Sequence, residues 1–515
     1  MLFNSHIFIF FFLPVAFMSY WWIKTAGGSL PARRWALFIT FVFFAWWHPP
    51  DLLVLIGSLV ANYFVGRRLL NYPPRQAYGT LFIGVAANLA VLGYFKYTRL
   101  VVATAQWLSG GEFIPGDIIL PLGISFFTFQ QIAYIIDCYR GEASRYAFLD
   151  YCLFVTFFPH LNAGPIIHHR ELMEEFTSGR RLSASMVAMG LTIFVIGLAK
   201  KVLLADTLAT FASPVFRAAQ HDVEPTLIDA WMGSLAYASQ LYFDFSGYSD
   251  MAIGVGLLFG VHLPINFASP YKSTSITEFW RRWHITLSRF LRNYLYIPLG
   301  GNRIGSIRTS ANLLVTMLLG GLWHGANWTF LAWGGLHGLF LLVHHRFTDT
   351  VKGRQPEAWL KRGVGRILCW LLTFACVLFS WVLFRADSFG AALRIWKGMA
   401  GFNGVAFTPR YLALLDQFRI DPAIFGHPAS PPILNPTSSA LAWVFGSVAL
   451  AVFAPNSQQI VGFSPTNQAP QDPMPGWARW LRWQPTLLWA LAFSLLGLIA
   501  LAHVTQLSEF LYFQF

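Results

Sequence analysis

Residues 309–345 read TSANLLVTMLLGGLWHGANWTFLAWGGLHGLFLLVHH and hold no Asp, Glu, Lys or Arg. A continuous helix of this length would span about 55 Å, whereas the hydrocarbon core of a bilayer is about 30 Å thick. The stretch must therefore break. The glycines and polar side chains of residues 320–327 mark the expected break, and His324 stands within it.

His324 is a candidate functional residue because of this position. Broken backbone and an ionisable side chain are tolerated at membrane depth only where protein buries them or where they line a watery cavity. The alternative is a neutral histidine that hydrogen-bonds two helices together and takes no part in chemistry.

The composition indicates a polytopic membrane protein. The chain has 515 residues, of which 56% are hydrophobic and 11% charged, whereas about a quarter of the residues in a soluble domain are charged. The apolar runs are continuous and rich in Phe and Trp, which favours an all-α helical bundle over an outer-membrane barrel. We expect about 11–13 spans with additional re-entrant or interfacial helices.

The basic residues indicate an orientation in the membrane. The net charge of +13 comes from Lys and Arg in short loops between apolar runs, a pattern of membrane topology and not of a nucleic-acid surface. The first cations, including Lys24 and Arg33, follow the first apolar run, so both termini are expected outside the cytoplasm. Residues 1–385 are the expected transmembrane core, residues 386–436 an outer loop with short helices, and residues 437–515 the last spans and tail. The cations of the loop count against its outer placement.

Residues 275–297 predict one amphipathic, basic helix. Its start fits the capping-box pattern at Ser275, and its apolar face includes Trp280 and Trp283. His284 lies at the edge of that face and is expected to point inward. The other face carries cations that suit lipid headgroups or the phosphates of a ligand, namely Arg281, Arg282, Arg289 and Arg292.

Further polar residues interrupt the apolar runs. The candidates are Ser125, Gln131, His160, Tyr242, Asp244 and Asp250. Such residues usually bond helices together, and the alternative is that they line a substrate path. The two acids either handle protons or satisfy buried cations.

Motif searches exclude several chemistries. His168 and His169 form a pair that invites a metal interpretation, but no carboxylate or cysteine stands at ligand spacing, so no metal site is predicted. The sequence has no phosphate loop ending in Gly-Lys-Ser/Thr, no Gly-x-Ser-x-Gly elbow and no His-Glu-x-x-His. These absences argue against ATP-driven transport and a serine hydrolase.

His284 and His324 remain as the candidate catalytic pair, since both stand in aromatic and apolar surroundings. Histidine can take a proton from a hydroxyl near neutral pH, and burial favours its neutral, basic form. This chemistry suits acyl transfer to an alcohol. The spacing alone does not show that the two side chains meet.

Two motifs carry a resemblance to a known family. Residues 279–285 read FWRRWHI and residues 321–327 read GLWHGAN. Together they resemble the signature of the membrane-bound O-acyltransferase (MBOAT) family, and within it the branch of bacterial alginate O-acetyltransferases. The resemblance covers roughly residues 2–385, because residues 120–141, 158–165, 240–254, 300–303 and 381–385 also fit.

The resemblance implies a bundle in which a cytoplasmic tunnel and an outer funnel meet at the family's essential histidine, which falls on His324. The family's second polar position, which is His, Asn or Asp in different members, falls on His284. The implied reaction transfers acetyl from acetyl-CoA in the cytoplasm, with His324 as general base and His284 positioning the thioester. The motif neighbours Trp280, Trp283, Trp323 and Asn327 are candidate lining residues.

The same resemblance implies the setting of the reaction. The chain would lie in the bacterial inner membrane, bind no permanent cofactor, and pass acetyl to periplasmic partner proteins that modify an exopolysaccharide. The arginines of residues 275–297 are candidate contacts for the phosphates of the donor, although cations at a membrane interface show the same pattern.

Two other classes of protein share these features. A transporter of polysaccharide or lipid-linked sugar is also a bundle with broken helices, but it favours an internal repeat, and none is evident in the sequence. A scaffold subunit of an export complex would tolerate replacement of both histidines. His344 and Asp349 fit the His-x4-Asp spacing of glycerolipid acyltransferases, but without an accompanying motif we interpret the match as chance.

Overall fold

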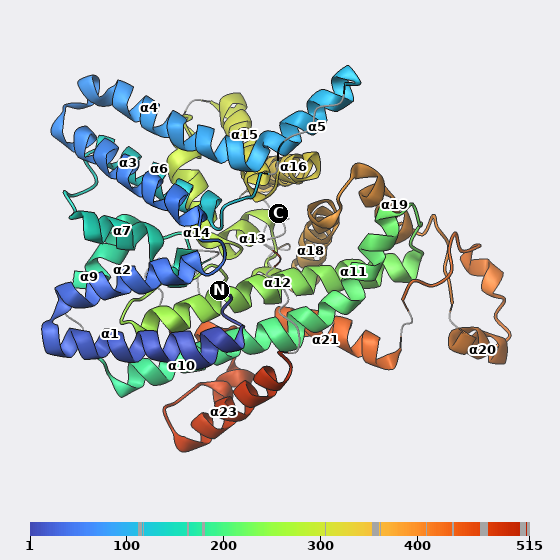
Figure 1. Cartoon of the computed structure of the whole chain (residues 1–515). Helices are drawn as coiled ribbons and strands as arrows, with labels where there is room; N and C mark the ends of the chain where they lie inside the picture. The colour runs from blue at the N-terminus through green and yellow to red at the C-terminus, as the bar shows by residue number, and fades with distance from the viewer. Residues whose placement is uncertain are drawn as a thin grey trace.

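The computed structural model is helical throughout its described part (Figure 1). It describes residues 1–111, 116, 118–161, 164–177, 181–303, 305–352, 360, 362–407, 409–434, 437–463, 472–504 and 511. No strand occurs among these residues. The all-α prediction is therefore confirmed.

The first part of the chain contributes two groups of helices. In Figure 1, α1 and α2 lie near the long helices of the lower layer, while α3, α4 and α6 form a group above them. The bounds are η1 (Phe8–Phe12), α1 (Leu13–Gly27), α2 (Ser29–Ala45), α3 (Asp51–Asn71), α4 (Pro74–Leu92), η2 (Gly93–Tyr97), α5 (Thr98–Ser109), α6 (Ile124–Tyr139), α7 (Phe148–Thr156), α8 (Phe158–Leu161) and α9 (His169–Thr177).

Helix α12 (Leu227–Leu258) runs through the middle of the molecule and is buried over most of its length. It packs on α10 (Ala184–Ala199) with the two backbones in contact. A Cβ added to Gly197 would lie 2.5 Å from the Gly247 carbonyl oxygen, and one added to Gly254 would lie 2.5 Å from the Gly190 oxygen. Small residues allow such close approach between helices in a membrane, where packing rather than hydrophobicity drives association.

The remaining helices surround this pair. Their bounds are η3 (Lys200–Ala205), α11 (Asp206–Gln220), η4 (Pro270–Lys272), α13 (Ile276–Arg282), α14 (Ile285–Leu291), η5 (Arg292–Tyr296), α15 (Ser306–His324), α16 (Trp328–Val351), α18 (Gly363–Arg385), α19 (Phe389–Met399), α20 (Pro409–Gln417), η6 (Pro422–Phe425), α21 (Ser438–Phe453), α22 (Ser457–Val461), η7 (Gly476–Leu481) and α23 (Leu487–Ala502). Figure 1 shows α20 standing away from the bundle. The predicted division into a core, an outer loop and C-terminal spans stays a prediction.

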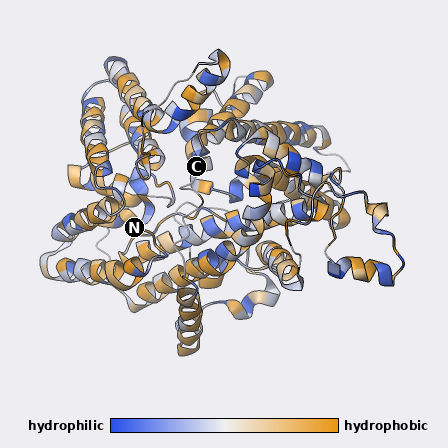
Figure 2. Ribbon diagram, turned by 45° about the vertical axis from the view of Figure 1, so that its right-hand side comes forward, coloured by the Kyte–Doolittle hydropathy of each residue, from blue (hydrophilic) through white to orange (hydrophobic). Residues whose placement is uncertain are grey.

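Within the described ranges, five helical segments are long and apolar enough to cross a bilayer: Phe8–Gly27, Asp51–Asn71, Pro74–Ser109, Ala184–Gln220 and Gly363–Arg385. Helices α21 and α23 are shorter but also apolar. On α23, Leu487 and Leu488 are each 76% exposed, and Figure 2 shows hydrophobic residues along the peripheral helices. Large exposed apolar surfaces suit contact with lipid, so the chain is a multi-pass membrane protein. The expected span count stays a prediction.

The apolar stretch 309–345 breaks where the sequence predicts. Helix α15 ends at His324, Gly325 is extended, and Asn327 caps α16 by accepting a hydrogen bond from the Thr329 amide at 3.1 Å. The two helices then pack as a hairpin whose closest point is glycine. A Cβ added to Gly321 would lie 2.3 Å from the carbonyl oxygen of Phe330 on the partner helix.

The single helix predicted for residues 275–297 is wrong. Ser275 does cap the start by accepting from the Glu278 amide at 3.2 Å, but the helix divides at His284, where φ is 43° and ψ is 53°. At the break, the backbone pairs with residues 266–268, which lie outside this helix. The amide of Ile285 donates to the Asn266 carbonyl at 3.0 Å, so α14 starts from a bond outside the helix. Such tertiary pairing leaves no local sequence pattern.

Candidate active site

The two candidate histidines meet inside the protein. His324 is the last residue of α15, and His284 links α13 to α14. Their ring centroids are 6.1 Å apart, and the residues are 4% and 0% exposed. Two helix ends far apart in sequence therefore bring two imidazoles to one place, and His284 points inward as predicted.

Aromatic rings enclose both imidazoles. The ring of His324 meets Trp333 edge-on at 5.2 Å and Phe384 at 5.3 Å, measured between centroids. His284 meets Phe245 edge-on at 4.8 Å. The arrangement buries both imidazoles in an apolar setting, where electrostatic interactions are stronger than in water.

A π-helical turn holds the backbone of α15 at its end. Lys96, in η2, donates through Nζ to the carbonyl oxygens of Trp323 at 2.6 Å and His324 at 3.3 Å. The Tyr97 hydroxyl donates to the Leu322 oxygen at 2.9 Å. The last carbonyls of a helix lack intrahelical partners, and a cation at that end opposes the helix dipole favourably. Lys96 and Tyr97 therefore fix the position of His324 through its backbone.

The sequence interpretation did not include Lys96, Trp333 or Phe384. The sequence contained a signal for each of these three residues. Lys96 is an ionisable residue at the end of an apolar run, and such residues are functional candidates in membranes. Phe384 lies in residues 381–385, which contribute to the family resemblance, and Trp333 lies in the stretch 309–345.

One of the four candidate lining residues lies at the site, and the other three make contacts that support it. Trp323 lies at the site, with its ring centroid 6.1 Å from that of His284. Trp283 packs against Trp381 at 4.9 Å. The Trp280 indole donates to Nδ1 of His337 at 3.3 Å. Asn327, besides capping α16, donates to the Asp387 carbonyl at 2.9 Å.

The two candidate acids, which both lie on α12, are paired with lysines of η3. Asp244 lies 2.6 Å from Nζ of Lys201, and Asp250 lies 2.6 Å from Nζ of Lys200. These pairs join α12 to η3 and favour the structural alternative over proton handling. Tyr242, from the same helix, is buried with its ring 6.4 Å from that of Trp283.

The remaining polar candidates bond helices together. Gln131 accepts from the Ser58 hydroxyl at 2.6 Å and also from Asn62, which joins α6 to α3. His160 is hydrogen-bonded to Gln130 at 3.2 Å. Ser125 is the exception, because its hydroxyl lies 3.4 Å from Nζ of Lys96 and so borders the site.

Two arginines of the basic face are ion-paired with carboxylates, and the other two are exposed. Arg282 forms a two-pronged contact with Asp472 at 2.7 and 3.0 Å, and this contact lowers the pKa of that carboxyl. Arg289 binds Glu171 at 2.6 and 2.9 Å. Arg281 and Arg292 are exposed.

Comparison with known proteins places this site in a family. Residues 132–382, which include both histidines, match the model of the membrane-bound O-acyltransferase family. The peptidoglycan O-acetyltransferase of Helicobacter pylori is 45% identical over 79% of this chain and 81% of its own length. A probable alginate O-acetylase AlgI of Pseudomonas syringae pv. tomato is 39% identical over the whole of both chains.

A more distant relative, the teichoic acid D-alanyltransferase of Streptococcus thermophilus, is 29% identical over 51% of this chain and 68% of its own length. All three relatives are named for transfer of an acyl group, which argues against the transporter and scaffold alternatives. The chain therefore belongs to the membrane-bound O-acyltransferase family and is an O-acyltransferase.

Proposed function

We propose that this chain transfers an acetyl group from acetyl-CoA toward the hydroxyls of a cell-envelope or extracellular glycan, with His324 as general base. The observation that carries the proposal is the meeting of two buried histidines, with ring centroids 6.1 Å apart, at the end of a broken helix. The names of the relatives that are 39–45% identical support acetyl as the group and a glycan as the final acceptor.

In the proposed step, an acceptor hydroxyl oxygen attacks the thioester carbonyl while its proton passes to the imidazole of His324. The new C–O bond forms, the C–S bond breaks, and the CoA thiolate takes up the proton as it leaves. His284 positions the thioester carbonyl. The rings of Trp333 and Phe384 keep water away from the reacting carbonyl, where water would compete as acceptor.

Exposed cations are the proposed contacts for the donor's phosphates. Arg281 and Arg292 can fill this role, because Arg282 and Arg289 already bind carboxylates. Guanidinium groups bind phosphate through charge-assisted hydrogen bonds. Replacing Arg281 and Arg292 by Gln should raise KM for acetyl-CoA with little change in kcat.

We further propose an inner-membrane setting with both termini in the periplasm. The support is the distribution of cations, since Lys24 and Arg33 follow the first apolar run. In this setting the acetyl group passes to periplasmic partner proteins that esterify the polymer. The family resemblance supports this division of labour.

The test is transfer of radiolabelled acetyl from acetyl-CoA in inside-out membrane vesicles that carry the chain with its neighbouring gene products. Native protein is compared with His324→Ala at matched abundance. His344→Ala is the matched control, because His344 is bonded to Thr277 at 3.0 Å at the far end of α16.

Label should reach protein or polymer with native protein and with His344→Ala, and be lost with His324→Ala. Equal labelling by all three would remove His324 from catalysis. No labelling by native protein, while another acyl donor is accepted, would overturn the choice of acetyl-CoA.

A further inference from the structure

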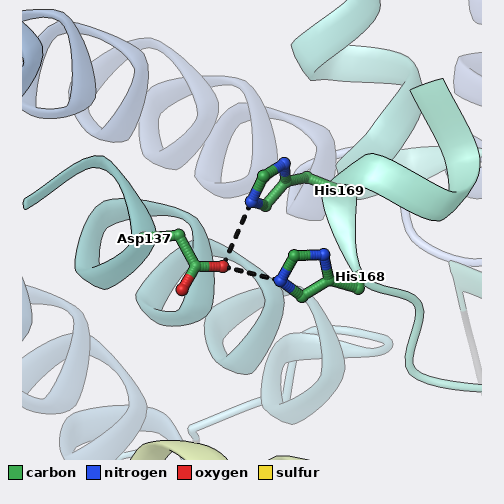
Figure 3. A group of neighbouring side chains, drawn as sticks. All are labelled: Asp137, His168 and His169. Carbon is green, nitrogen blue, oxygen red and sulfur yellow. Dashed lines mark hydrogen bonds and ion pairs between the residues drawn. The ribbon is translucent and has the colours of Figure 1, made fainter. Parts of the chain in front are cut away.

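A second cluster of histidines lies outside the candidate active site. Asp137, near the end of α6, meets His168 and His169 at the start of α9 (Figure 3). Its Oδ2 lies 2.9 Å from Nε2 of His168 and 3.1 Å from Nε2 of His169. Sequence spacing does not connect these residues, because the carboxylate stands on a different helix.

We propose that Asp137, His168 and His169 form a binding site for a divalent transition metal ion, with zinc as the best fit. Two imidazole nitrogens and one carboxylate oxygen are a ligand set that zinc uses in proteins when a fourth position stays open. One ligand atom from each residue lies within 4.8 Å of the others. Tetrahedral zinc with ligands at about 2.0–2.2 Å keeps them a little over 3 Å apart, so small shifts suffice.

The number of donors on one oxygen favours a metal over a purely hydrogen-bonded cluster. Asp137 Oδ2 faces three groups, because the Tyr294 hydroxyl also donates to it at 2.7 Å. The other oxygen, Oδ1, is buried with no hydrogen-bond partner among the residues that the structure describes. A carboxylate oxygen has two lone-pair directions, so three hydrogen bonds on Oδ2 beside none on Oδ1 is a poor arrangement. A metal ion bound by Oδ2 and both Nε2 atoms removes the excess of hydrogen bonds on Oδ2.

The charge of the cluster points the same way. Asp137 is 1% exposed, and in the described part of the chain neither Lys nor Arg forms an ion pair with it. The nearby Arg140 and Arg170 donate instead to backbone carbonyls, of Asn293 and Glu142. A buried carboxylate needs a compensating positive charge, and a bound divalent ion supplies one.

The surroundings fit a metal site in two further ways. Nδ1 of His169 lies 2.9 Å from the Tyr146 hydroxyl, and a metal-binding histidine usually donates its other N–H to an oxygen. The His168 side chain is 26% exposed, which gives an ion a path of entry. Bound metal would tie the start of α9 to α6, independently of acyl transfer.

The experiment measures metal in the purified full-length protein in detergent. Native protein is incubated with zinc sulfate and desalted. It should then carry close to one zinc ion per chain, measured by elemental mass spectrometry. His168→Ala removes the most exposed ligand and should lower the content at least about 10-fold. His262→Ala is the matched control, because that half-buried histidine pairs with Glu175 near the other end of α9 and should leave the content unchanged.

Cobalt supplies a second readout that does not depend on activity. Co²⁺ in the native protein should give visible absorption bands of a tetrahedral site, and these bands should be lost with His168→Ala. Tyr294→Phe should keep the bands while weakening metal affinity by about 10- to 100-fold. Native protein without bound zinc or cobalt bands would overturn the proposal, as would equal metal content in native protein and His168→Ala.

Discussion

The described bonds to two buried histidines of the α15–α16 hairpin reach different parts of each residue. His337 is held by its ring: the Trp280 indole donates to Nδ1 at 3.3 Å, so Nε2–H donates to the Ser380 hydroxyl at 2.8 Å. His324 is held by its backbone, through the bonds from Lys96 to the end of α15. The bonds to His337 thus reach its ring, whereas the bonds from Lys96 reach the backbone at His324. Burial alone does not distinguish a structural from a catalytic histidine.

The largest effect is expected when the two histidines are replaced in parallel. His324→Ala should lower kcat by about 10²- to 10⁴-fold, the range for loss of a positioned general base, while the amount of folded protein stays near native. His337→Ala should instead lower thermal stability and retain most activity per folded molecule. Acetyl transfer and thermal unfolding of the same detergent samples check both. A reversal of the two results would break the comparison.

Gly325→Ala should disturb the site, because Gly325 lies in the break between α15 and α16. A Cβ at this position would lie 2.1 Å from Cε2 of Phe330, whose ring packs on Phe384 at 4.9 Å, and Phe384 borders His324. Displacement of about 1 Å in a site lowers rates by about 10²-fold. The control is Gly57→Ala, because a Cβ at Gly57 meets nothing within 4 Å. Native activity in Gly325→Ala would show that this break tolerates movement.

Lys96→Met should release the end of α15 and act on rate more than on binding. Loss of the ammonium leaves the carbonyls of Trp323 and His324 without this donor, and we expect kcat to fall about 10-fold with KM little changed. Steady-state kinetics separate the two constants. Arg99→Met is the matched control, since its guanidinium donates to an exposed carbonyl, that of Ile118, at 3.4 Å, away from the end of α15. A rise in KM alone would reassign Lys96 to substrate binding.

Ser380→Ala should have the smallest effect and should touch stability only. It removes the acceptor of the His337 ring, and a buried donor left unsatisfied destabilises by about 1–3 kcal/mol. The melting temperature should fall by a few degrees while acetyl transfer per folded molecule is unchanged. A loss of activity without a loss of stability would place His337 in the chemistry.

Sequence reasoning predicted the parts of this architecture that local patterns encode. The charge-free stretch 309–345 and its glycines predicted the break at His324, and the motif around His284 predicted an inward-facing histidine. The division of the basic helix at His284 escaped prediction, because it depends on pairing with Asn266. The Lys96 clamp and the meeting of Asp137 with two histidines also join distant segments, and periodicity carries no information on such contacts.

The left-handed backbone at His284 limits which residues the position can hold. Most side chains are strained at φ 43° and ψ 53°, and Asn, Asp and His are the non-glycine types enriched in that region. The family resemblance implies His, Asn or Asp at this position in different members. The residue types implied at this position therefore follow what the backbone tolerates as well as what the chemistry requires. A replacement at this position therefore has to suit the left-handed backbone as well as the chemistry.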